Sequence, residues 1–268
     1  IRRGEVRVMA TFTGQELFAE YAAMAIMMQY FLMRWARRIT ERAFWICGML
    51  LLLAAVAATA TRGGAIILVA GFLYVIVVGG KVVPRVQSTR VVFVAIALFY
   101  LGLGLVEPLV SHLMDRMATI GADDSSVQSR ADVLQQAVDA VTRNPFIGHG
   151  IATAAGTFRG AVSLNIHNLY LTLAYTIGIP GLLFFVWFLA GLWRKGKRIF
   201  DDQLADQRTR EIALALNTML VMFLIDQIKI EYVRQPMTMH LTWLHFGFIM
   251  ASWRIATKQQ RIPDEVAG

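Results

Sequence analysis

The chain has 268 residues, of which 57% are hydrophobic and only 16% are charged. Soluble domains usually carry about a quarter charged residues, so this composition excludes an ordinary soluble domain. The formal net charge of +8 would suit a nucleic-acid partner in a soluble protein. Here the basic residues lie between hydrophobic runs, which is typical of membrane topology, and we expect no nucleic-acid partner.

Seven hydrophobic segments follow one another along the chain. They cover residues 17–33, 43–60, 64–80, 91–110, 168–193, 212–228 and 238–253. A helix of about twenty apolar residues crosses ~30 Å of hydrocarbon, and isolated apolar runs cannot close a β-barrel. We therefore predict an all-α, polytopic transmembrane helix bundle with about seven membrane segments, which forms a single membrane-embedded domain over residues 1–268.

The chain begins with Ile1 in the basic stretch IRRGEVRV, which lacks the regions of a signal peptide. We expect the sequence to be the C-terminal portion of a longer protein that has further N-terminal helices.

Basic residues predict the orientation of the segments. Sixteen of the 26 Lys and Arg residues lie in four stretches that all fall on one side, which the positive-inside rule makes cytoplasmic. These stretches are residues 34–42, 81–90, 194–211 and the tail from 254. The opposite side then contains a large loop, residues 111–167, and still carries ten basic residues, nine of them Arg. Either they contact lipid headgroups, or their planar donor groups bind the phosphate oxygens of a polyanion.

Within this outer loop, residues 129–143 (SRADVLQQAVDAVTR) predict a short amphipathic helix. Ser129 and Asp132 fit a capping box, and Leu134, Ala137, Val138 and Val141 form one apolar face. Arg130 is expected to point with that face towards the protein. The following NPFIGHG ends the helix, because Asn-Pro stops it and the glycines let the backbone turn. His149 in this turn is a secondary candidate for a site role.

His167 and Asn168 stand directly before an apolar run that is interrupted after about three turns by Gly178, Pro180 and Gly181. An imidazole titrates near neutral pH and can accept a proton from a hydroxyl, but a histidine at a helix start is also often a capping or interface residue. Asn168 would orient a substrate or cap the helix. Irregular backbone at membrane depth requires cover by protein or by a cavity, and we expect this break to line a cavity open to the outer leaflet.

The spacing His-Asn, nine residues, Gly178, two residues, Gly181 resembles the HN-x9-G-x-x-G signature of the O-antigen ligase family of membrane glycosyltransferases. TATRGG at 59–64 resembles the S/T-R-G element of this family. SRADVL with the later NPFIGHG resembles its R-x-x-x-W…P-x-x-G-x-G element, with Leu134 at the aromatic position. The resemblance covers roughly residues 10–250.

The resemblance implies transfer of a glycan from an undecaprenyl-diphosphate-linked donor to a hydroxyl of lipid A-core, a glycan or another acceptor. His167 would be the general base and Asn168 would orient substrate. Arg62 and Arg130 match motif arginines and would bind the diphosphate, with Arg143 and Arg159 as second choices. Because arginines can neutralise the leaving group, we expect a metal-independent enzyme without cofactors.

The expected location is the bacterial inner membrane, in contact with its lipids, with the site facing the periplasm. A polysaccharide polymerase or a protein O-glycosylation enzyme would use the same donor chemistry, and these residues do not separate the three. A transporter or flippase is the alternative from another class; it would predict inverted repeats and polar groups at mid-membrane.

Overall fold

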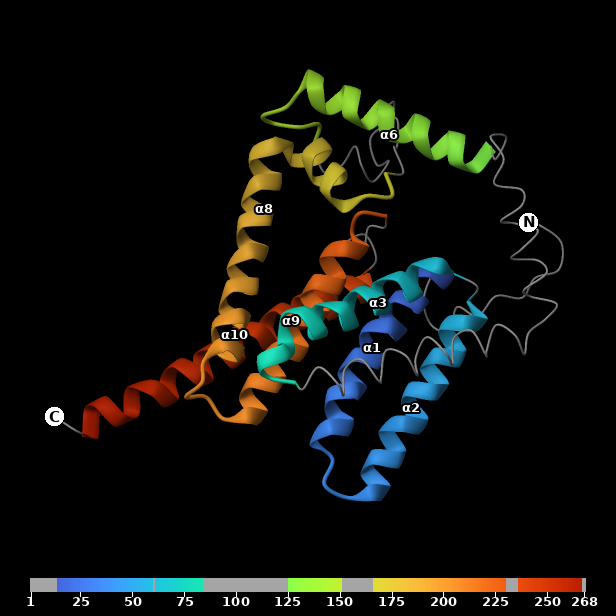
Figure 1. Ribbon diagram of the computed structural model, residues 1–268. Helices are drawn as coiled ribbons and strands as arrows, with labels where there is room; N and C mark the ends of the chain where they lie inside the picture. Colours follow the sequence, from blue (N-terminus) through green and yellow to red (C-terminus); the bar gives the residue numbers. More distant parts are fainter. Residues whose placement is uncertain (1–13, 60, 84–124, 151–165, 230–235, 267–268) are drawn as a thin grey trace. The chain divides into compact units, whose positions relative to one another are not determined.

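The computed structural model describes residues 14–59, 61–83, 125–150, 166–229 and 236–266. Every regular element in these ranges is a helix (Figure 1). The elements are α1 (Gln15–Trp35), α2 (Ile39–Ala58), α3 (Arg62–Val77), the 3-10 helix η1 (Gly79–Lys81), α6 (Ser125–Arg143), α8 (Leu169–Asp201), α9 (Gln207–Asp226) and α10 (Pro236–Val266). The all-α prediction is therefore confirmed for the described part of the chain.

Six of the seven predicted hydrophobic segments correspond to helices, and the segment at 91–110 lies outside the described residues. Among the described helices, α2 and α8 are long and apolar enough to cross a membrane, and α3 contains a shorter apolar stretch, Gly63–Val77. The number of seven crossings stays a prediction. α8 continues to Asp201 because Lys and Arg, which follow its apolar stretch, are good helix formers.

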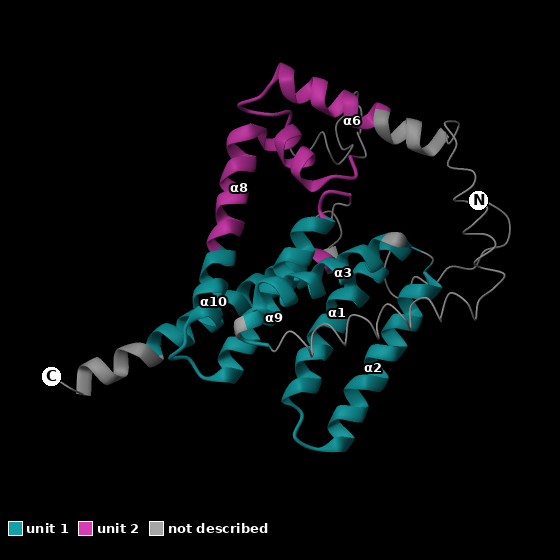
Figure 2. Cartoon of the chain, in the orientation of Figure 1, with its two compact units in different colours: residues 1–106, 192–226, 240–268 teal, residues 107–191, 227–239 magenta. Residues whose placement is uncertain are grey.

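The chain divides into two compact units (Figure 2). Unit 1 comprises residues 1–106, 192–226 and 240–268, and unit 2 comprises residues 107–191 and 227–239. Two such units can belong to one helix bundle, so the single-domain prediction stays a prediction.

Unit 2 is built around α6 and the first half of α8. A small buried cluster is formed by Ala137 of α6, Tyr175 of α8 and Ile166, which precedes α8. Partly buried side chains pack against it, namely Val133, Ala140, Val141 and Leu171. Leu134 and Val138, predicted to face the protein, are instead 40% and 45% exposed. The packed face shares Ala137 and Val141 with the predicted face but contains Val133 and Ala140 in place of Leu134 and Val138. A helix that ends before Asn144-Pro145 is confirmed, but it begins at Ser125, so the predicted start with a capping box at Ser129 and Asp132 is wrong.

In unit 1, α1 is the central helix and contacts α2, α3 and α9. Small residues on α1, among them Ala19, Ala22 and Ala23, are fully buried and permit close approach of the neighbouring backbones. A Cβ on Gly64 of α3, for example, would lie 2.9 Å from the carbonyl oxygen of Ala19. Larger side chains, including Tyr30 and Phe72 with rings 5.5 Å apart, fill the adjoining core.

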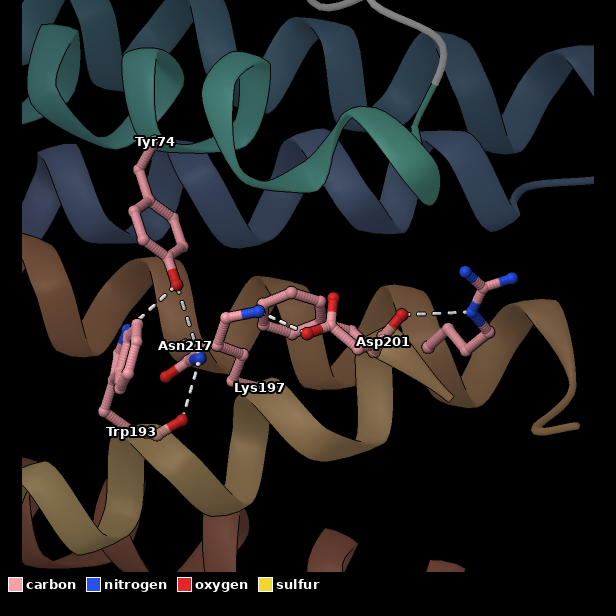
Figure 3. Close-up of polar contacts among 7 residues, drawn as sticks. Tyr74, Trp193, Lys197, Asp201 and Asn217 are labelled. Atoms are coloured by element: carbon pink, nitrogen blue, oxygen red, sulfur yellow. Dashed lines mark hydrogen bonds and ion pairs between the residues drawn. The ribbon is translucent and has the colours of Figure 1, made fainter. Parts of the chain in front are cut away.

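A polar network connects three helices of unit 1 (Figure 3). Tyr74 of α3, Trp193 of α8 and Asn217 of α9 point towards one another. The indole Nε1 of Trp193 donates to the Tyr74 hydroxyl at 3.0 Å, and the Asn217 amide donates to the Trp193 carbonyl oxygen at 3.2 Å. Asn217 is fully buried, so these bonds supply partners that lipid would not provide.

The buried carboxylate of Glu211, near the start of α9, connects this helix to the end of α1. It accepts hydrogen bonds from Arg34, Trp35 and Gln207, each at 2.8 Å. Gln207 also donates to the Val82 carbonyl oxygen at 2.8 Å, which attaches the segment after η1 to the same cluster. Burial acts to raise the pKa of Glu211, but the hydrogen bonds and charge of Arg34 and the bond from Gln207 outweigh it, and the pKa lies below its ordinary value.

We predict that Glu211→Gln lowers the melting temperature at pH 7, corresponding to about 1–2 kcal/mol of lost stability, because Arg34 loses its ionic partner. A carboxyl whose pKa is lowered by folding stabilises the fold above its unfolded pKa of about 4.3, and this contribution disappears as pH falls through the folded pKa. The difference in melting temperature between the unsubstituted protein and the variant should therefore shrink below about pH 4.3. The matched control is Glu41→Gln, an exposed glutamate in the first turn of α2. A difference that does not change with pH would contradict the assignment.

Candidate functional site at the start and break of helix 8

The residue expected to act as a base, His167, is exposed, whereas its neighbours on both sides are fixed. Ile166 is fully buried in the core of unit 2, and its carbonyl oxygen accepts hydrogen bonds from the Asn168 amide at 2.7 Å and the Thr172 hydroxyl at 3.3 Å. The backbone is thus anchored one residue before the histidine, while the imidazole itself is presented at the surface. This combination suits a group that has to meet a substrate in a defined position.

Asn168 uses both ends of its side-chain amide. Its Oδ1 accepts a hydrogen bond from the Leu171 amide at 2.9 Å, which caps the N-terminus of α8. Its Nδ2 donates to the Ile228 carbonyl oxygen at 2.8 Å, and the Leu169 amide donates to the Gln227 carbonyl oxygen at 2.9 Å. These bonds fasten the turn after α9 beside His167. Capping, one of the two roles expected for Asn168, is therefore observed, and substrate orientation stays a prediction.

The backbone of α8 breaks at Gly178, where φ is 76° and ψ is 173°. Residues with a side chain scarcely populate this region, so the break depends on glycine. Pro180, two residues later, has no N–H and therefore cannot donate to the carbonyl oxygen of Thr176, four residues before it. The break leaves carbonyl groups of the preceding turn without helical partners, and these require other donors.

The donors come from the segment that follows α6, residues 144–150, which we call the 144–150 turn. The amides of His149 and Gly150 donate to the carbonyl oxygens of Tyr175 and Thr176 at 2.8 and 2.9 Å. In the other direction, the Ile179 amide donates to the Pro145 carbonyl oxygen at 2.7 Å. NPFIGHG and G-x-x-G, which are separate elements in the sequence, thus form one hydrogen-bonded structure.

The two backbones approach so closely that side chains would not fit between them. A Cβ on Gly178 would overlap the carbonyl oxygen of Phe146, and a Cβ on Gly148 would lie 2.7 Å from the Gly178 amide nitrogen. The expectation that the break lines a cavity is therefore wrong for this side of α8, since the 144–150 turn covers it. The general requirement that irregular backbone be covered is met by protein instead.

His149 takes part in this contact and is only partly exposed. Its ring stacks on the ring of Tyr175 with centroids 4.6 Å apart and an interplanar angle of 9°. Asn144 Nδ2 lies 3.3 Å from His149 Nε2, within hydrogen-bonding distance. Through these contacts His149 connects the 144–150 turn to α8.

Of the four arginines expected to bind a diphosphate, the structure describes some fully and others only in part or not at all. Arg143 is the last residue of α6 and is exposed. Arg62 begins α3 and Arg130 lies in α6, but their side chains are outside the described part, as is the whole of Arg159. Arg62 belongs to unit 1 and His167 to unit 2. A common site for these residues stays a prediction.

Every regular element in the described part of the chain is a helix, two of these helices are long and apolar enough to cross a membrane, and His167 is exposed on an anchored backbone. The chain belongs to the O-antigen ligase family: the model of that family, described as O-Antigen ligase, matches residues 47–186, just over half of the chain. No match was found among curated proteins. Family membership indicates a glycosyltransferase-like enzyme with ligase or polymerase activity in polysaccharide biosynthesis, which uses a lipid-linked glycan and a polysaccharide or lipid acceptor.

We predict that Gly178→Ala destabilises the protein by about 2–4 kcal/mol, because the backbone conformation is strained for alanine and the added methyl group displaces the 144–150 turn. The matched control in the same helix is Gly191→Ala, where a Cβ would meet nothing within 4 Å. Hydrogen–deuterium exchange should show faster exchange of the His149 and Gly150 amides in Gly178→Ala only. Equal protection in both variants would show that the turn is not held by the break.

Proposed function

We propose that the protein transfers a glycan from an undecaprenyl-diphosphate-linked donor to an acceptor hydroxyl, with His167 as the general base. The observation that carries the proposal is the exposed imidazole of His167 between buried Ile166 and the capping residue Asn168, in a chain of the O-antigen ligase family. A general base must be held in place and still reach a substrate, and an exposed side chain on an anchored backbone supports this role.

In the proposed reaction, the acceptor oxygen forms a bond to the anomeric carbon of the donor glycan while the bond from that carbon to the diphosphate breaks. His167 takes the proton of the acceptor hydroxyl. The developing charge on the lipid diphosphate needs fixed cations, and guanidinium groups provide two parallel donors to phosphate oxygens at any working pH. Arg62 and Arg130 are proposed for this role, with Arg143 and Arg159 as further contacts and Asn168 as a group that also orients the substrate.

The same proposal includes independence from metal ions and cofactors, since the arginines would neutralise the leaving group. It places the protein in the bacterial inner membrane as a multi-pass protein, with the site facing the periplasm, where lipid-linked rather than nucleotide-linked donors are present. The acceptor would be lipid A-core, another glycan or a different hydroxyl compound. Polymerase activity is the second candidate, because the family indicates ligase-like or polymerase-like chemistry.

We predict that His167→Ala reduces glycan transfer by about 100-fold or more without lowering the melting temperature, because the side chain is exposed and its removal opens no cavity. The measurement is transfer from a lipid-linked donor by purified protein, together with surface-glycan analysis of a deletion strain that carries the variant. Shortened chains would indicate a polymerase, and unattached chains would indicate a ligase. His240→Ala, a second exposed histidine, is the control. Normal transfer by the His167 variant would remove the catalytic assignment.

We predict that Arg130→Lys lowers transfer by at least about 10-fold, because lysine keeps the charge but loses the planar pair of donors to the diphosphate. The control is Arg254→Lys, an exposed arginine of α10 on the predicted cytoplasmic side, which should leave transfer unchanged. Rates measured at saturating and limiting donor concentrations separate donor binding from the chemical step. Full activity of Arg130→Lys would exclude a bidentate contact at this position.

A further inference from the structure

The tip of the 144–150 turn exposes two large apolar side chains. Phe146 is 78% exposed and Ile147 is 86% exposed. Full burial of such a side chain would stabilise a protein by about 1.5–3 kcal/mol. Their exposure does not come from a loose loop. The residues on either side of the tip are hydrogen-bonded to α8 through Pro145, His149 and Gly150. The turn therefore holds these side chains away from the core of unit 2.

An apolar surface of α8 begins at the same point. The hydrogen bond from Ile179 to Pro145 brings the start of the second half of α8 next to the tip. From there, Ile179, Leu183, Val186 and Trp187 follow at spacings of four, seven and eight residues, which places them on one helix face. All four are exposed within the chain, from 40% at Ile179 to 64% at Trp187. α8 is also one of the helices long and apolar enough to cross a membrane, so this face fits hydrocarbon.

Two residues of α6, Leu134 and Val138, are also large apolar side chains that are exposed. They are one turn apart on an exposed side of a helix whose other exposed residues include Asp132, Gln135, Gln136 and Asp139. An apolar stripe on an otherwise polar surface helix is typical of a helix that lies in the membrane interface. Arg143 at the end of α6 is exposed directly before the tip, where a cation would meet lipid phosphates.

We propose that the tip of the 144–150 turn is inserted into the acyl region of the bilayer and anchors unit 2 at a fixed depth. Its partner is bilayer lipid, which accommodates exposed Phe146 and Ile147 together with the face of α8 that begins beside them. Because the turn is hydrogen-bonded to the break, the anchor also sets the depth of the break. Leu169 to Ile177 form the short helical stretch between the break and His167, about 13 Å long at 1.5 Å per residue. The consequence that the anchor sets the reach of His167 towards a lipid-linked substrate rests on the proposed function.

The test of insertion does not depend on enzymatic activity. Cys47, the single cysteine of the chain, is replaced by serine, and one cysteine is introduced by Ile147→Cys or, as the matched control, Asp139→Cys on exposed α6. Each protein is labelled with an environment-sensitive fluorophore and reconstituted into phosphatidylethanolamine–phosphatidylglycerol vesicles. Some vesicles contain lipids spin-labelled near the top of the acyl chain.

We expect at least threefold stronger quenching by the spin-labelled lipid at position 147 than at position 139, with blue-shifted emission at 147 only. Phe146→Cys provides a second reporter at the tip, so that a folding defect in one variant does not decide the result. Equal quenching at positions 147 and 139 would overturn the proposal. Blue-shifted emission at 147 without lipid quenching would also overturn it, because a protein surface, including a second copy of the chain, would then cover the tip. Insertion with normal transfer by His167→Ala would leave the anchor in place and remove only the proposed function.

Discussion

The arrangement of unit 2 depends on the hydrogen bonds between the 144–150 turn and the broken backbone of α8. Gly178 and Pro180 interrupt the helix and deprive carbonyl groups of their usual donors, and the amides of His149 and Gly150 replace them. In a membrane protein such replacement is required, since hydrocarbon supplies no hydrogen bonds. The close approach in turn requires glycine at positions 148 and 178. Two short motifs are thus explained by one interaction, because each supplies hydrogen-bond partners to the backbone of the other.

His167 gains its position from the same half of α8. The helix is capped by Asn168 at one end and joined to the turn at the other, while Ile166 anchors the chain just before it. In unit 1, by contrast, side-chain rather than backbone groups connect the helices. Glu211 and Asn217 of α9 are the central residues of two buried polar networks there. Both units therefore place their buried polar groups where helices have to be held in register.

The helices themselves could be predicted from the sequence, because length and hydrophobicity suffice for segments such as those of α2, α8 and α9. The amphipathic helix α6 and its end at Asn144-Pro145 followed from local signals as well. Its packing face did not, since Val133 and Leu134 are both apolar and only the contact with Ile166 and Tyr175 selects between them. The pairing of the 144–150 turn with the break could not be predicted either. Main-chain hydrogen bonds between segments some thirty residues apart leave no periodic signal, although the glycines and Pro180 marked both participants.

The order of the two partners along the chain bears on how the protein is made. The 144–150 turn precedes Gly178 in the sequence, so the ribosome completes it before the break in α8 is synthesised. When the nascent segment containing Tyr175 and Thr176 enters the bilayer, the amides that will donate hydrogen bonds to those carbonyl oxygens already exist. The reverse order would oblige the insertion machinery to hold an incomplete helix until later residues emerged. A broken membrane helix is in this way compatible with synthesis from the N-terminus to the C-terminus.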